Sequence, residues 1–123
     1  MKRIIAAFAV LASFGALAGD GYAHIHDATP REMAAVKSSV TANFKDPDSA
    51  KFRNVKVLVD GDSRTVCGEV NAKNSYGAYV GYTKFYATLV DFGKGTDPIV
   101  IAPIIDQEDS SDALKQCNAK GLF

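Results

Sequence analysis

The first eighteen residues constrain this chain most, because they determine how much of it remains to fold and in which compartment. Lys2 and Arg3 precede an uncharged apolar run over residues 4–14 and then the small-x-small sequence Ala16-Leu17-Ala18. These are the three parts of a secretory signal peptide. The apolar run is shorter than the roughly 20 residues that a membrane-spanning helix needs. We therefore expect residues 1–18 to be removed and the remaining protein to be soluble, and either periplasmic or secreted.

Removal of 18 of the 123 residues leaves 105, a length that suits one domain with one hydrophobic core. The remaining chain has 12 basic and 14 acidic residues, which gives a net charge of −2. A nearly neutral surface lacks the basic patch of nucleic-acid-binding proteins and gives no reason to expect attraction to anionic lipids. We expect no nucleic-acid partner, and the sequence indicates no cofactor.

Two cysteines, Cys67 and Cys117, lie 50 residues apart. In an oxidising compartment, such a pair is expected to form a disulfide rather than a metal or redox site. The alternative is two free, buried thiols.

The chain after the signal peptide is expected to begin with a flexible leader at residues 19–28, followed by a single domain at residues 29–123. Thr29, Pro30 and Glu32 together predict the start of a helix, with Thr29 as cap, Pro30 at the first helical position and Glu32 completing a capping box. Apolar residues then recur at helical spacing up to Phe44, and we expect the helix to end near Phe44 or Lys45. The apolar stripe consists of Met33, Val36, Val40 and Phe44.

Alternating and branched residues predict four strands after this helix. The last of them, Ile99 to Ile105, is almost continuously apolar, which predicts burial on both faces, although Pro103 favours a sheet edge or a bulge. A final helix is expected to be capped by Asp109 or Ser110 and closed by Gly121. The four strands are predicted at residues 52–59, 65–71, 82–92 and 99–105.

The order of elements is therefore helix, four strands, helix. Short connections favour an antiparallel meander, so we predict an α+β domain with the N-terminal helix on one face of a four-stranded antiparallel sheet. A Cys67–Cys117 disulfide would tie the C-terminal helix to the sheet. This order resembles cystatin-like folds, in which a sheet wraps around one helix.

Two segments are distinctive in composition. Residues 45–52 read KDPDSAKF and residues 67–82 read CGEVNAKNSYGAYVGY. Together they resemble an uncharacterised family of small exported bacterial proteins with "KDPDSAxF" and "CGEVNAKNSYGxYVGY" motifs. The resemblance covers about half of the chain that remains after signal-peptide removal and implies a shared fold, but it implies no particular activity.

The segment from Asn71 to Gly81 is much longer than a hairpin connection needs, and long loops in compact domains are usually functional or disordered. Tyrosines combined with Gly, Ser and Asn are typical of binding loops. We therefore predict a binding loop; the alternative is that its tyrosines pack over the core as a lid. The predicted binding residues are Asn71, Lys73, Asn74, Tyr76, Tyr79 and Tyr82.

The sequence thus favours a non-enzymatic binding module that contacts a protein or an envelope component. One alternative is a small hydrolase of envelope polymers that uses Glu69 and the tyrosine loop. Another is metal capture by His24 and His26, if the signal peptide is cut after Ala23 so that the new amino group and His26 can chelate Cu²⁺ or Ni²⁺. Because both histidines fall in the expected leader, no Ser-His or Cys-His catalytic site is predicted.

Overall fold

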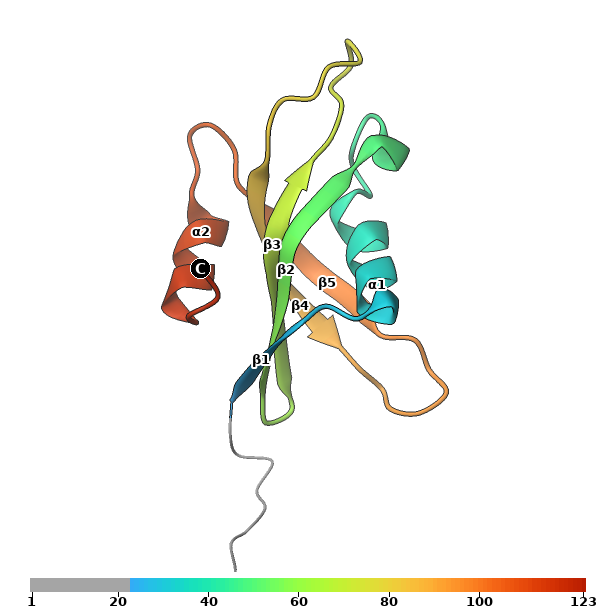
Figure 1. Ribbon diagram of the computed structural model, residues 1–123, viewed down its shortest axis with the longest axis vertical. Coiled ribbons are helices and arrows are strands. Elements are labelled where there is room, and N and C mark those ends of the chain that lie inside the picture. Colours follow the sequence, from blue (N-terminus) through green and yellow to red (C-terminus); the bar gives the residue numbers. More distant parts are fainter. Residues whose placement is uncertain (1–22) are drawn as a thin grey trace, which may run out of the picture.

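The computed structural model describes residues 23–123, so the expected signal peptide lies outside the described residues. Five strands form one antiparallel sheet in the order β1-β2-β3-β4-β5, and the two helices lie on opposite sides of it (Figure 1). This confirms the α+β class and the antiparallel meander. The elements are β1 (His24–Asp27), α1 (Pro30–Val40), the short 3₁₀ helix η1 (Pro47–Ser49), β2 (Lys51–Asp60), β3 (Ser63–Asn71), β4 (Thr83–Val90), β5 (Ile99–Ile105) and α2 (Asp112–Ala119). Within residues 23–123, neither α1 nor α2 combines the length and apolar character that a membrane span requires.

The predicted sheet of four strands is one strand short, because His24–Asp27, expected in the leader, forms β1. This strand pairs antiparallel with residues 56–59 of β2, and the pairing continues through a hydrogen bond from the Ala28 amide to the Val55 carbonyl (3.0 Å). Asp27 also forms an ion pair with Lys56. A four-residue strand with one apolar residue has no hydrophobic periodicity of its own. Its formation depends on pairing with β2, which is distant in the sequence.

Helix α1 begins as predicted. The Glu32 amide donates to the Thr29 hydroxyl (3.2 Å), and the Thr29 amide donates to Glu32 Oε1 (2.9 Å), which completes the capping box. The helix ends at Val40, earlier than expected, and the Thr41 hydroxyl donates to the Lys37 carbonyl (2.6 Å) at this end. The apolar stripe still faces the sheet: Val36 and Val40 are buried, and Met33 and Phe44 pack against the same core.

The main core lies between α1 and the sheet. Its centre is Phe85, which is fully buried and meets the ring of Phe52 edge-on at 5.8 Å between centroids. Gly68 lies directly beneath, where a Cβ atom would approach both Phe85 and Val55 closely. The buried members of this core are Val36, Val40, Val55, Val57, Val66, Val70, Phe85, Ala87, Leu89 and Val100.

A smaller cluster lies on the opposite face of the sheet, beneath α2. Cys67 and Cys117 form the predicted disulfide there, with their Cα atoms 6.1 Å apart, and Leu122 is buried beside them. Leu58 and Tyr86 pack against this cluster from the sheet. Successive residues of β3 point to opposite faces, so Val66 enters the main core while Cys67 enters the smaller one.

The predicted burial of β5 on both faces is wrong. The strand lies at the edge of the sheet, and Ile99, Ile101 and Ile104 are 46%, 46% and 39% exposed. The other expectation for this segment, an edge or a bulge at Pro103, is confirmed: the preceding Ala102 has φ of 51°, and the register with β4 shifts there. An apolar run indicates a strand, but its position in the sheet decides its burial.

The predicted cap of the last helix is also wrong. Helix α2 begins at Asp112, and neither Asp109 nor Ser110 caps it. Instead the carboxylate of Asp106 accepts from the amides of Ala113 (2.7 Å) and Leu114 (3.0 Å). This acceptor precedes the helix by several residues, outside the window in which a local capping pattern would be sought.

We expect Cys67→Ser and Cys117→Ser each to lower the free energy of unfolding by about 4 kcal/mol, because the bond restricts the unfolded chain over a 50-residue separation. The double variant should lose little more than either single variant, since all three lack the same bond. Denaturant unfolding without reductant measures this. Additive losses would contradict a shared bond.

We expect Gly68→Ala to lower the free energy of unfolding by about 1–3 kcal/mol, the usual cost of overfilling a core. The new Cβ would lie 2.8 Å from Phe85 Cζ and 2.9 Å from Val55 Cγ2. Because Phe85→Leu would make room, the combined variant should lose less than the sum of the two single losses. Strictly additive losses in denaturant unfolding would contradict this contact.

Candidate binding site

The loop between β3 and β4 is an ordered extension of their hairpin. Lys73 pairs antiparallel with Tyr79, and the Asn74 amide donates to the Ala78 carbonyl (2.9 Å). The Gly77 amide closes the turn on the Asn74 carbonyl (3.0 Å), with Gly77 at φ of 77°, a conformation that favours glycine. In Figure 1 this hairpin extension projects beyond the end of the sheet. We refer to residues 72–82 as the hairpin loop.

Two of the predicted binding residues hold the backbone of this loop. The side-chain oxygen of Asn74 accepts from the amides of Tyr76 (2.9 Å) and Ala78 (3.2 Å). The side-chain oxygen of Asn71 accepts from the Gly81 amide (3.1 Å). Within residues 23–123, neither NH₂ group of these two side chains makes a hydrogen bond, so each is the part of its side chain that could contact a ligand.

Tyr79 rests against the segment before β2. Its hydroxyl donates to the Ser49 carbonyl (2.9 Å), and the Lys73 amide donates to the Ser49 hydroxyl (2.9 Å). The ammonium groups of Lys51 and Lys73 lie 4.6 Å and 5.6 Å from the centre of the Tyr79 ring. The two distinctive sequence segments therefore meet in space, and η1 supports the hairpin loop.

Tyr82 is held in a similar way at the base of the loop. The guanidinium carbon of Arg53 lies 3.8 Å from the centre of the Tyr82 ring, a cation–π contact of about 0.5–1 kcal/mol at an exposed site. Arg53 in turn donates to Glu69 Oε2 (3.0 Å). Within residues 23–123, none of the three loop tyrosines joins either buried cluster, so they do not form a lid over the core.

Tyr76 differs from the other two tyrosines, because it points away from the protein. Its side chain is 94% exposed, and Val80 on the returning strand of the loop is 71% exposed. Val80 also lines an apolar pocket of about 230 Å³, together with Phe44, Val70 and Ile105. An ordered loop thus presents an aromatic and an aliphatic side chain to solvent.

Glu69, on β3 before the hairpin loop, is the candidate acid of the hydrolase alternative. Its burial tends to raise its pKa, but hydrogen bonds from Asn54 and Arg53, with the positive charges of Lys84 and Arg53, outweigh this and lower the pKa below 4.5. A general acid needs a raised pKa to hold its proton near neutral pH. Glu69 is instead an ionised group that fixes Arg53 under Tyr82.

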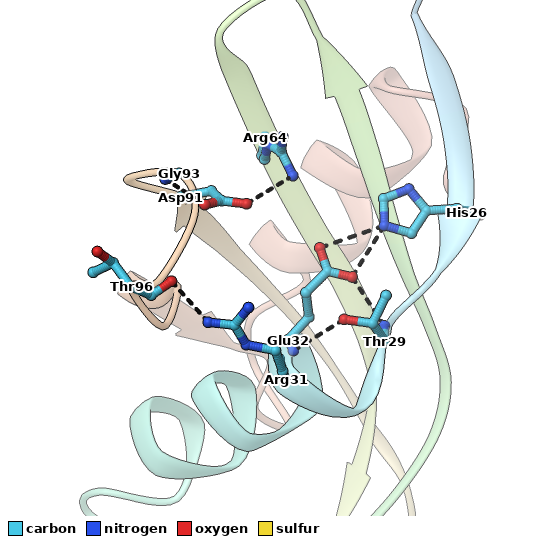
Figure 2. A network of polar contacts seen from close by, with 8 residues as sticks. All are labelled: His26, Thr29, Arg31, Glu32, Arg64, Asp91, Gly93 and Thr96. Atoms are coloured by element: carbon cyan, nitrogen blue, oxygen red, sulfur yellow. Dashed lines mark hydrogen bonds and ion pairs between the residues drawn. The ribbon is translucent and has the colours of Figure 1, made fainter.

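A second polar cluster, which the sequence analysis missed, lies at the start of α1 (Figure 2). His26 Nε2 lies 3.0 Å from Oε1 of Glu32. Glu32 is buried, with only 6% of its surface exposed. Arg31 donates to the Thr96 carbonyl (2.9 Å), and Arg64 pairs with Asp91 (3.4 Å). The capping-box pattern predicts the position of Glu32 in the helix. No pattern in the neighbouring sequence predicts that His26, Arg31 and Arg64 lie near it. They line a cavity of about 410 Å³.

His26 is therefore held by a buried carboxylate, and its expected position in a flexible leader is wrong. That position does not exclude His26 from nucleophilic catalysis. Within residues 23–123, however, no serine, threonine or cysteine side chain is hydrogen-bonded to its ring, and both cysteines are in the disulfide. The arrangement orients an imidazole without placing a nucleophile beside it.

The ion pairs of Glu69 predict a specific pH dependence of stability. Because its pKa is lowered on folding, ionised Glu69 stabilises the fold above its ordinary pKa of 4.5, and this contribution is lost as the pH falls through the lower folded-state value. We expect Glu69→Gln to be less stable than wild type at neutral pH, with the difference shrinking in acid. Urea unfolding over a pH series tests this, with the exposed Glu108→Gln as control. A difference that stays constant with pH would contradict it.

Comparison of the chain with protein-family models, curated proteins and solved structures gives no significant match. The family resemblance of the two distinctive segments therefore stays a prediction. Because one fold can host unrelated functions, the function depends on the geometry of the site itself.

Proposed function

We propose that this protein is a small exported, non-enzymatic binding module, periplasmic or secreted after signal-peptide cleavage. Its hairpin loop contacts a protein or an envelope component, with Tyr76 and Val80 as the central contacts. Lys73, Tyr79, Tyr82 and the NH₂ groups of Asn71 and Asn74 border the contact.

The observation that carries this proposal is the exposure of Tyr76 on a loop whose backbone is fixed. An isolated exposed aromatic is unremarkable, but here Asn74 bonds directly to the Tyr76 amide and the Lys73–Tyr79 pair closes the loop beneath it. A loop that is ordered before binding loses less conformational entropy on binding. Tyrosine adds a large contact area with few rotatable bonds.

Binding is favoured over hydrolysis because Glu69, Arg53 and the Tyr79 hydroxyl are all engaged in supporting the loop. Glu69 is held ionised by Arg53 and Asn54, and Arg53 stacks on Tyr82. The Tyr79 hydroxyl is bonded to the backbone of Ser49. These groups build a rigid scaffold, whereas catalysis would require a proton donor or a nucleophile directed at the substrate.

The export part of the proposal is supported by two features. The Cys67–Cys117 disulfide is compatible with an oxidising compartment. The amino-terminal sequence has the three-part layout of a signal peptide.

The experiment is a capture from cell-envelope and culture fractions with immobilised wild type, Tyr76→Ala and Phe92→Ala. Tyr76 makes no side-chain hydrogen bond within residues 23–123, so its truncation should leave the fold intact. Phe92 is a matched control, since it is an exposed aromatic (63%) on the β4–β5 connection. We expect wild type and Phe92→Ala to capture the same partner and Tyr76→Ala to lose it.

For the captured partner, truncation of a central tyrosine should cost about 2 kcal/mol or more, which corresponds to a roughly thirtyfold weaker affinity. Surface plasmon resonance measures this change. Equal affinity of Tyr76→Ala and wild type would show that another face binds the partner. Release of sugar or peptide fragments from envelope polymers by the wild type would instead support the hydrolase.

A further inference from the structure

Strand β1 lies at the end of the sheet remote from the hairpin loop (Figure 1), and it carries His24 and His26. His24 and His26 are two residues apart in a strand, so both point to the same face, and they pair with Val59 and Val57 of β2. Their ring centroids are 5.9 Å apart and the ring planes differ by 31°. With metal–nitrogen bonds of about 2.0–2.1 Å, two imidazoles at this spacing lie within the reach of one ion after small side-chain rotations.

The His26 ring is also held in the orientation and tautomer that a metal ligand needs. A carboxylate accepts hydrogen bonds, so Nε2, at 3.0 Å from Glu32 Oε1, carries the proton. The lone pair of the ring is then on Nδ1, which Figure 2 shows at the edge of the ring away from Glu32. A carboxylate that binds the second ring nitrogen is the usual supporting partner of a metal-ligating histidine.

Glu32 is itself firmly placed. It is only 6% exposed, and its carboxylate also accepts a hydrogen bond from the Thr29 amide (2.9 Å) in the capping box. Three nearby cations have acidic partners: Arg64 pairs with Asp91, Lys56 with Asp27 and Arg31 with Asp97. These pairs offset part of the positive charge near the histidines, to which Lys94 on the same cavity also contributes, and so reduce the repulsion that a metal cation would meet.

We propose that His24 and His26 form a surface site for a divalent transition metal ion, with Glu32 as the supporting carboxylate. Within residues 23–123 no cluster of three or more His, Cys, Asp or Glu side chains is placed to hold a metal, so water fills the remaining positions. A site with two protein ligands and open positions exchanges its metal readily, unlike a closed structural site. Among Zn²⁺, Ni²⁺ and Cu²⁺, imidazole ligands should bind Cu²⁺ most tightly.

This site differs from chelation by a free amino terminus. That mode needs a chain beginning at His24 and uses the amino group, backbone amides and the His26 imidazole, but not the His24 side chain. The strand site needs both side chains and no particular terminus. A chain beginning at Gly19 separates the two modes, and it retains every element of the fold, because all of them lie within residues 23–123.

The test is isothermal titration of this chain with CuSO₄ and, separately, with ZnCl₂ in a weakly coordinating buffer. We expect one ion per chain, with Cu²⁺ bound more tightly than Zn²⁺. His24→Gln and His26→Gln should each weaken Cu²⁺ binding at least tenfold. Glu32→Gln should weaken it about tenfold or more through loss of the supporting carboxylate, while glutamine can still complete the capping box.

Glu108→Gln is the control, because Glu108 is an exposed acid on the connection between β5 and α2, beside the base of the hairpin loop and away from β1. It should leave the Cu²⁺ affinity unchanged. Zn²⁺ titration followed by NMR of the imidazole signals of unmutated protein provides a readout that needs no variant, and both histidines should shift together. Wild-type affinity in His24→Gln, or a shift confined to one histidine, would overturn the two-histidine site, as would the absence of binding to the wild type.

Discussion

The architecture depends on the alternation of side chains along β3, and above all on Cys67. Val66 and Val70 enter the main core under α1, whereas Cys67 faces α2 and bonds to Cys117. The cluster under α2 has few buried side chains, and an eight-residue helix is too short to be stable alone. The disulfide and the Asp106 cap therefore add to the packing of Leu122 in holding α2 on the sheet.

The hairpin loop depends on support from outside itself. Its own residues form the turn through Asn74, but Ser49 of η1 fixes Lys73 and Tyr79, and Lys51 and Arg53 of β2 cover the tyrosine rings. A turn followed by a basic strand thus serves as the platform of a loop more than twenty residues later in the sequence. The two distinctive segments are therefore joined by hydrogen bonds and cation–π contacts in the fold.

The parts of the fold that the sequence predicts are those whose signal is local. The capping box of α1, the strand at Ile99–Ile105 and the cysteine pair each depend on a few neighbouring residues or on one possible pairing. The parts that it misses depend on distant partners. Strand β1 exists because residues 56–59 offer a free edge, α2 starts where the Asp106 carboxylate reaches it, and the exposure of β5 follows from its place at the edge. The candidate site divides in the same way, because the sequence of residues 71–81 indicates a long, tyrosine-containing loop but not which of its tyrosines faces outward.

One irregularity lets a single strand serve both the core and the hairpin loop. In β2 the register with β3 shifts between Arg53 and Lys56, so that Asn54 and Val55 both lie opposite Gly68. Asn54 takes a positive φ of 54°, which asparagine tolerates better than most residues, and its side chain bonds to Glu69. Without the extra residue, Arg53 and Val55 would point to the same face, and either the arginine would enter the core or the valine would leave it. The bulge therefore sends Val55 into the core while turning Arg53 toward Glu69 and Tyr82, which couples the packing of the sheet to the position of the loop.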